Sequence, residues 1–148
     1  MDYKIIVDSR EQQKLWTKDV IVKGMKTGDY SVEYNGIDYS DKIALERKSL
    51  SDLFGTLGQG HARFKKELER ARELEYFAIV IDGSINNIYT KNFVGAKYTR
   101  IQGYVIAKIL FTLHIKYGIN IFFGENRNGS KRIIKGIFEA YLKQKEQK

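Results

Sequence analysis

Two uninterrupted apolar runs, at residues 5–7 and 77–81, constrain the fold of this chain more than any other feature. A strand with one face in water alternates apolar and polar residues, and neither run does so. Runs of this kind are typical of strands that are covered on both faces. Helical patterns lie between and after them, so strands and helices alternate along the chain. The sequence therefore predicts an α/β domain built in layers.

Shorter segments complete the expected set of elements. Further strands are expected at residues 20–22, 30–34, 37–39, 43–48 and 119–123. The Asn35-Gly36 pair predicts a tight type I′ turn between the second and third of these, because both central residues of such a turn need positive φ. Ser49 is expected to cap a helix, and a second helix is expected over residues 62–75, after a break at residues 58–60.

The C-terminal half is expected to hold two more helices. Thr99 and Gln102 have the spacing of a capping box, and Gly118 would end the helix that they open. Its apolar stripe would be Ile101, Val105, Ile109 and Leu113. A last helix carries an apolar stripe over residues 133–142, which either packs on the sheet or also forms a dimer surface. Segment 83–97 is expected to be a long loop, functional or mobile.

Composition narrows the class of protein. The chain has 148 residues, no cysteine and 43% hydrophobic residues, which favours one domain, over residues 1–148, with a substantial core. Disulfides, thiol nucleophiles and cysteine-bound metals are excluded. No apolar run approaches the ~20 residues of a membrane span, and no signal peptide is evident. We therefore expect an intracellular protein, in the cytoplasm or nucleoid, without a membrane partner.

Charge is distributed unevenly along the chain. Residues 1–60 hold 9 basic and 10 acidic side chains, whereas residues 61–148 hold 17 basic and 8 acidic ones. A near-neutral front half and a basic back half suggest one acidic site beside a surface for a polyanion such as nucleic acid. The alternative is a lysine-rich surface that serves only solubility.

Four acidic residues fall where the expected strands end or begin. Asp8 ends the first strand, Asp29 precedes the hairpin, Glu46 lies near the end of a later strand, and Asp52 opens a helix. An antiparallel return of the chain would bring Asp29 and Glu46 close together. Clustered carboxylates are costly unless a cation lies among them, and Mg²⁺ prefers oxygen ligands. Taken singly, each acid is typical of a solvated surface.

Lys48 lies two residues beyond Glu46 in the same expected strand. Because residues i and i+2 of a strand point to the same face, Glu46 and Lys48 share a face and Arg47 points away. The pattern thus places an ammonium group beside a possible metal ligand. Such a group can stabilise charge on a phosphate, or orient and help deprotonate an attacking water.

These blocks together resemble the nuclease domain of the XPF-type family. The family signature is Gly-Asp, a variable gap, Glu-Arg-Lys, three residues, and Asp. Here it is matched by Gly28-Asp29 and by Glu46-Arg47-Lys48 followed by Asp52, with Val7-Asp8-Ser9-Arg10-Glu11 before them. Residues 60–64 also resemble the family's arginine–aromatic segment. The likeness covers nearly the whole chain, with its detail in residues 7–64.

The resemblance implies a restriction-endonuclease-like, three-layer core with a central mixed sheet flanked by helices. It implies hydrolysis of DNA phosphodiesters with Mg²⁺ or Mn²⁺. Asp29 and Glu46 would be the principal metal ligands, with the carbonyl of Arg47 and, in part through water, Asp8. Lys48 would act on the water or the phosphate, and Asp52 would complete the acidic site. Arg10 and Arg47 would position the site; Glu11 is a weaker member or the partner of an arginine.

Basic residues outside the signature are expected to contact DNA phosphates. The candidates are His61, Arg63, Lys65, Lys66 and Arg100. For any single lysine, a solvated surface is the competing interpretation. Contacts of this kind would add salt dependence without base specificity.

The substrate class and the partners follow from the same resemblance. Family members tend to cut forks, 3′ flaps or related junctions, and larger members carry helix–hairpin–helix or helicase domains, which we do not expect here. Selectivity would then come from the nuclease domain, from a homodimer through the C-terminal helices, or from a separate partner. Alternatives are a non-catalytic DNA-binding scaffold and a Holliday-junction resolvase acting as a symmetric dimer.

Overall fold

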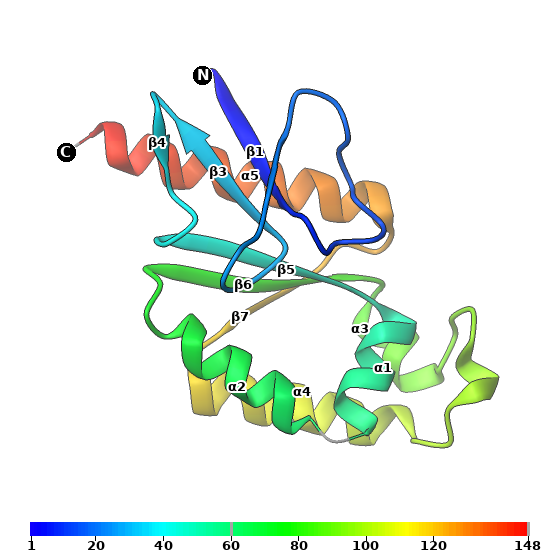
Figure 1. Ribbon diagram of the computed structural model, residues 1–148. Helices are drawn as coiled ribbons and strands as arrows, with labels where there is room; N and C mark the ends of the chain where they lie inside the picture. Colours follow the sequence, from blue (N-terminus) through cyan, green and yellow to red (C-terminus); the bar gives the residue numbers. More distant parts are fainter. Residues whose placement is uncertain (60, 148) are drawn as a thin grey trace.

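A seven-stranded mixed sheet forms the centre of the molecule, in a computed structural model that describes residues 1–59 and 61–147 (Figure 1). Its order is β2-β1-β3-β5-β6-β7, with β4 paired to β3. The β1–β3, β3–β4 and β3–β5 pairs are antiparallel and the others are parallel. The strands are β1 (Tyr3–Asp8), β2 (Ile21–Lys23), β3 (Tyr30–Tyr34), β4 (Ile37–Asp38), β5 (Ile43–Ser49), β6 (Tyr76–Asp82) and β7 (Asn120–Phe123).

Helices cover both faces of this sheet. In Figure 1, α5 crosses one face, and α1, α2 and α4 lie together on the other. The helical segments are α1 (Leu50–Gly58), α2 (Ala62–Ala71), α3 (Ile85–Thr90), α4 (Gly103–Tyr117) and α5 (Arg127–Glu146), with a 3₁₀ turn η1 (Ala96–Tyr98). The predicted α/β class, with a mixed sheet between helical layers, is confirmed. Among the described residues, no helix is long and apolar enough to cross a membrane.

Two hydrophobic clusters, one on each face, explain the uninterrupted apolar runs. Successive residues of β1 point to opposite faces, so Ile6 joins the cluster under α1, α2 and α4, while Val7 joins the cluster under α5. Ile79 and Val80 of β6 divide in the same way. Both faces of these strands are therefore covered, as the sequence predicted.

The apolar stripe of the last helix packs on the protein's own sheet. Ile134, Phe138 and Leu142 of α5 are fully buried with strand residues such as Val32 and Leu45. The sheet-packing interpretation of this stripe is thus confirmed. Ile133, Ile137 and Tyr141 of the same stripe are only partly buried, so the additional role as a dimer surface stays a prediction.

Turn and cap predictions were confirmed in part. Asn35 and Gly36 have φ angles of 53° and 75°, as the type I′ turn requires, and Ser49 accepts a hydrogen bond from the Asp52 N–H at 3.1 Å. The predicted capping box at Thr99 is wrong: α4 begins only at Gly103, and the Thr99 hydroxyl accepts from the Ile101 N–H instead.

Two predicted segment boundaries also need correction. The expected loop over residues 83–97 contains α3, which begins with a capping box of Ser84 and Asn87. The helix expected over residues 62–75 ends at Ala71. Gly60, part of the predicted break before that helix, lies outside the described residues.

Helix α4 buries a different face from the one that four-residue spacing indicated. Its buried residues are Gly103, Ile106, Ala107, Leu110 and Leu113. Val105 and Ile109, from the predicted stripe, are only partly buried. Gly103 allows the close approach of α3 and α4, because a Cβ there would lie 1.9 Å from the Ile88 carbonyl oxygen.

Candidate active site

The backbone at Gly28 and Asp29 brings the start of β3 against the middle of β5. Gly28 has a φ of 79°, and a Cβ at this position would lie 3.0 Å from the Ala44 Cβ. The Asp29 N–H donates to the Leu45 carbonyl at 2.8 Å, and the Asp8 N–H donates to the Asp29 carbonyl at 2.8 Å. Glycine is therefore required here for steric and conformational reasons. Its consequence is that Asp29 lies between the end of β1 and the centre of β5.

Asp29 and Glu46 are neighbours across this strand pair, as the antiparallel return predicted. The Asp29 Oδ2 accepts from the Arg47 N–H at 2.8 Å, which fixes the carboxylate beside the residue that follows Glu46. Glu46 is 7% exposed. Two carboxyl groups thus share a mostly buried space in which water can stabilise their charges only weakly.

The electrostatics of the pair reflect this burial. Burial, followed by the negative charge of Glu11, raises the pKa of Asp29 to about 7, although the hydrogen bond from the Arg47 N–H acts in the opposite direction. Burial and then the charge of Asp29 raise the pKa of Glu46 well above its ordinary value. A divalent cation would remove the repulsion between these groups, so the donor set fits a metal ion.

Lys48 lies on the same face as Glu46, as strand alternation predicted. Its Nζ is 3.5 Å from Glu46 Oε2 and donates to the Thr56 hydroxyl at 3.2 Å. It also lies 5.5 Å from the centre of the Phe64 ring. One contact on the strand and two on α1 and α2 thus hold the ammonium group beside the carboxylates.

Arg47 points to the opposite face of β5. Its guanidinium forms an ion pair with Asp82 at the end of β6, in which Nε donates to Asp82 Oδ2 at 3.0 Å. The other Asp82 oxygen accepts from the Ser130 hydroxyl at 2.6 Å. The side chain therefore joins β5, β6 and α5, while the carbonyl of Arg47 remains on the strand between Glu46 and Lys48. A metal-binding role of that carbonyl stays a prediction.

Asp8 and Arg10 form a separate clamp at the end of β1. Arg10 donates to both carboxylate oxygens of Asp8, at 3.1 and 3.2 Å, and also to the Met25 carbonyl. The Met25 N–H donates to Asp8 Oδ1 at 2.8 Å. Both oxygens of Asp8 are thus hydrogen-bonded. Direct metal binding by Asp8 would compete with these bonds, whereas contact through water would not require their loss.

The remaining acids of the signature occupy different positions. Asp52 is exposed on the first turn of α1. Within the described part of the chain, no hydrogen bond links its carboxylate to Asp29 or Glu46. Glu11 accepts from the Tyr30 hydroxyl at 3.2 Å. Among the described residues, no arginine forms an ion pair with Glu11. Its negative charge contributes to the raised pKa values of both Asp29 and Arg47.

Glu67 is a further acidic residue that the sequence analysis missed. It lies on α2, and its negative charge contributes to the raised pKa values of both Asp29 and Glu46. Its sequence signal is weak but real: it follows Arg63 by four residues, so the two share one helix face. Both line a cavity of about 540 Å³ that Lys48 and Thr56 also line.

Protein side chains would supply only part of the ligand shell of a bound metal ion. Within residues 1–59 and 61–147, no three histidine or carboxylate side chains are placed to hold one ion together. An ion at Asp29 and Glu46 would thus complete its shell with backbone carbonyl, water and phosphate oxygens. That mixture is typical of Mg²⁺ sites that act on phosphates.

The five predicted DNA-contacting residues lie on several surfaces around α1 and α2. Arg63 lines the 540 Å³ cavity beside Lys48. His61 and Lys65 line a groove between α2 and α4, whereas Arg100 lines a cavity of about 520 Å³ next to α1. Lys66 is exposed on α2. The structure places Arg63 alone of these five on the cavity shared with Lys48.

The layered mixed sheet, with Glu46 and Lys48 on β5 and Asp29 directly before β3, defines a restriction-endonuclease-like domain. The chain belongs to the ERCC4 domain family, whose model matches residues 6–137. It is therefore an XPF-type nuclease domain, as the signature predicted. Comparison with curated protein sequences found no match.

Solved structures agree with this assignment. XPF from Aeropyrum pernix is similar over 94% of this chain, with a TM-score of 0.70 and 24% sequence identity. A second structure, of XPF from Aeropyrum pernix in complex with DNA, is similar over 97% of this chain, with a TM-score of 0.69 and 22% identity. This chain corresponds to 65% and 66% of those two chains. At these identities, the likeness shows the fold.

Proposed function

We propose that this protein is a metal-dependent DNA endonuclease that cuts phosphodiesters near branch points, in DNA repair or recombination inside the cell. The observation that carries the proposal is the contact of Lys48 with Glu46, 3.5 Å apart, beside Asp29 at the start of the neighbouring strand β3. Membership of the ERCC4 domain family supports the same reaction.

Mg²⁺ or Mn²⁺ is the proposed cofactor, held by Asp29, Glu46 and the carbonyl of Arg47. When bound there, the ion would neutralise charge on the phosphate and acidify a water molecule. Asp29 and Glu46 keep raised pKa values without it, so they are suited to exchange protons for a cation. Asp8 and Asp52 would contribute through water.

Lys48 is the proposed catalytic residue that contacts the reacting groups. Glu46, Thr56 and Phe64 hold its ammonium group in place, so little reorganisation is needed when a phosphate arrives. A fixed positive charge stabilises the extra negative charge of the transition state. It can also donate a hydrogen bond to the attacking water, which orients the water and helps its deprotonation.

DNA is the proposed substrate. The chain carries a formal charge of +8, concentrated in residues 61–148, and Arg63 lies on the cavity beside Lys48. Phosphate contacts by Arg63, Lys65, Lys66, His61 and Arg100 would give affinity without sequence preference. The similarity to an XPF that was solved in complex with DNA supports this assignment.

A homodimer is proposed through the C-terminal helices α4 and α5. On α4, Phe111 and Ile115 are 48% and 80% exposed, and on α5 Ile133 and Ile137 are only partly buried. The two residues of each pair lie four positions apart and therefore share one helix face. Light scattering at high protein concentration should show twice the mass of one chain, and a monomer would contradict this arrangement.

The proposed activity is tested by cleavage of end-labelled DNA. The substrates are duplex, single strand, 3′ flap, 5′ flap, fork and four-way junction, each with Mg²⁺, Mn²⁺ or EDTA. Metal-dependent cuts next to a branch, absent in Asp29→Asn, are the expected result. Binding without cleavage on every substrate would favour the non-catalytic scaffold, and paired symmetric cuts in the four-way junction alone would favour the resolvase.

A further inference from the structure

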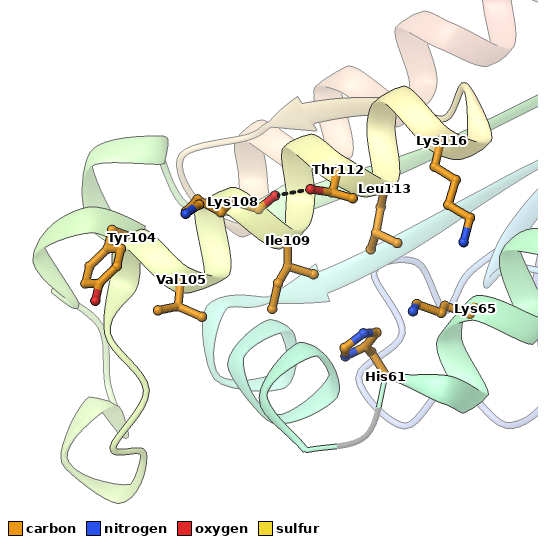
Figure 2. A pocket seen from close by; sticks show the side chains of 9 residues that line it. All are labelled: His61, Lys65, Tyr104, Val105, Lys108, Ile109, Thr112, Leu113 and Lys116. Carbon is orange, nitrogen blue, oxygen red and sulfur yellow. Dashed lines mark hydrogen bonds between the residues drawn. The ribbon is translucent and has the colours of Figure 1, made fainter.

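A groove of about 350 Å³ lies between α2 and α4, outside the site described above. Figure 2 shows Val105, Ile109 and Leu113 in a row on α4, pointing toward α2, with His61 and Lys65 on the opposite wall. The lining is mostly apolar. We name this feature the α2–α4 groove.

Positive charge surrounds the apolar lining. Lys65, Lys108 and Lys116 all line the α2–α4 groove, together with the exposed ring of Tyr104. Among the described residues, no carboxylate lines it. Glu69, one turn beyond Lys65, forms an ion pair with Arg72 at 3.5 Å. Such a groove complements a ligand that combines flat apolar groups with negative charges.

The walls of the groove are fixed relative to each other. Arg72, at the end of α2, donates from Nη2 to the Lys116 carbonyl at 3.0 Å. Its guanidinium also lies 5.0 Å from the centre of the Tyr117 ring. The ends of the two helices are therefore tied together, and the groove does not depend on a ligand for its shape.

Helix α2 separates the α2–α4 groove from the active-site cavity. Arg63 and Glu67, four residues apart, line the cavity beside Lys48. His61 and Lys65, also four residues apart, line the groove. A strand with one phosphate at Lys48 would thus have to cross only the width of one helix, ~10–12 Å with side chains, to enter the groove.

We propose that the α2–α4 groove binds an unpaired arm of the DNA whose branch lies at the active site. This inference rests on the proposed function, since it names the part of the substrate that this surface recognises. A duplex hides its bases and presents phosphates, which need lysines but no apolar lining. An unpaired strand presents both, with bases for Ile109 and Tyr104 and phosphates for the three lysines.

The test compares the affinities of two labelled DNAs by fluorescence anisotropy at one salt concentration. One DNA is a blunt duplex, and the other is the same duplex with an oligothymidine arm, both in EDTA so that metal-dependent cleavage cannot occur. The variants are Lys108→Ala/Lys116→Ala and, separately, Tyr104→Ala. The matched control is Lys4→Ala/Lys143→Ala, which changes two exposed lysines on β1 and α5, away from the groove. Unfolding temperatures establish that all variants fold.

The arm should strengthen binding by the unchanged protein about tenfold, as stacking of a few bases would. Both groove variants should lose most of this gain and keep their affinity for the blunt duplex, whereas the control should behave like the unchanged protein. The inference would be overturned if the groove variants lost affinity equally for both DNAs. It would also be overturned if they kept the full gain from the arm, and an acidic peptide would then be the better occupant of the groove.

Failure of the inference can be separated from failure of the proposed function. Cleavage of the branched DNAs in Mg²⁺ is measured in parallel with the unchanged protein. Suppose that cleavage is normal, but the groove variants keep the full gain in affinity that the arm provides. This result rejects only the inference. No cleavage and no affinity for either DNA rejects both.

Discussion

Glu46 is a buried carboxylate surrounded mainly by other carboxylates. It is almost fully buried, with Asp29 and Glu67 beside it and with Lys48 as its ion-pair partner. One ammonium group cannot compensate several carboxylates, so the site is adapted to a further cation. This imbalance is the residue-scale reason to assign a metal to the site.

The raised pKa values predict how stability depends on pH in metal-free protein. The pKa of Asp29 rises from an ordinary 3.8 to about 7 on folding, so between these values the folded state binds more protons than the unfolded chain. The contribution of Asp29 to the free energy of unfolding is therefore largest below pH 3.8 and is lost as the pH rises to about 7.

Urea unfolding in EDTA across this pH range measures the effect. Relative to the unchanged protein, Asp29→Asn should show a flatter profile, since its amide does not titrate. Addition of Mn²⁺ at neutral pH should raise the urea midpoint of the unchanged protein and not of the variant. Parallel profiles with and without the substitution would refute the assignment.

Glu67 is expected to support the metal from α2. Glu67→Gln should raise the Mn²⁺ concentration for half-maximal cleavage by roughly tenfold, as is common when a group behind the direct ligands is lost. The control is Glu73→Gln, an exposed residue just beyond the end of α2. If both variants need the same Mn²⁺ concentration as the unchanged protein, Glu67 does not serve the metal.

At the scale of elements, Arg47 links β5, the strand of Glu46 and Lys48, to β6 and α5. Its guanidinium and Asp82 are about 10% exposed, and Ser130 of α5 completes the link. Removal of one partner from a buried ion pair leaves the other charge uncompensated. Loss of cleavage in an Arg47 variant would therefore report on folding as well as on chemistry.

Arg47→Ala should lower the free energy of unfolding by roughly 3 kcal/mol. Because Asp82 is its partner, the double variant with Asp82→Ala should be destabilised by clearly less than the sum of the two single changes. Urea unfolding of the three variants measures both quantities. Strict additivity would show that the two side chains act independently.

Predictability differed between elements for physical reasons. β1, β6 and the Asn35-Gly36 hairpin were predicted because local pattern alone determines them. Helix α4 is apolar on several sides, so the four-residue spacing of Val105 and Ile109 indicated a face that proved to line a groove. Which face is buried depends on contact with Ile88 of α3 at Gly103, and no local pattern contains that information.

At the scale of the whole molecule, the sheet brings residues that are far apart in the sequence together in one site. Sequence alone indicated that Asp29, Glu46 and Lys48 gather, since an antiparallel strand pair and alternation suffice for that. It did not indicate Glu67, which arrives from a separate helix by tertiary packing. Nor did it show that Asp8 is held by Arg10 and Met25, a contact between the ends of β1 and β2.

The central claim is that Asp29, Glu46 and Lys48 form one catalytic site. The most direct test is single-turnover cleavage of one branched DNA in Mn²⁺, with Kd measured for the same DNA. Lys48→Ala and Asp29→Asn should each cut at least about 100-fold more slowly while their Kd stays close to that of the unchanged protein. Rates within a few-fold of the unchanged protein, or cleavage that persists in EDTA, would contradict the account.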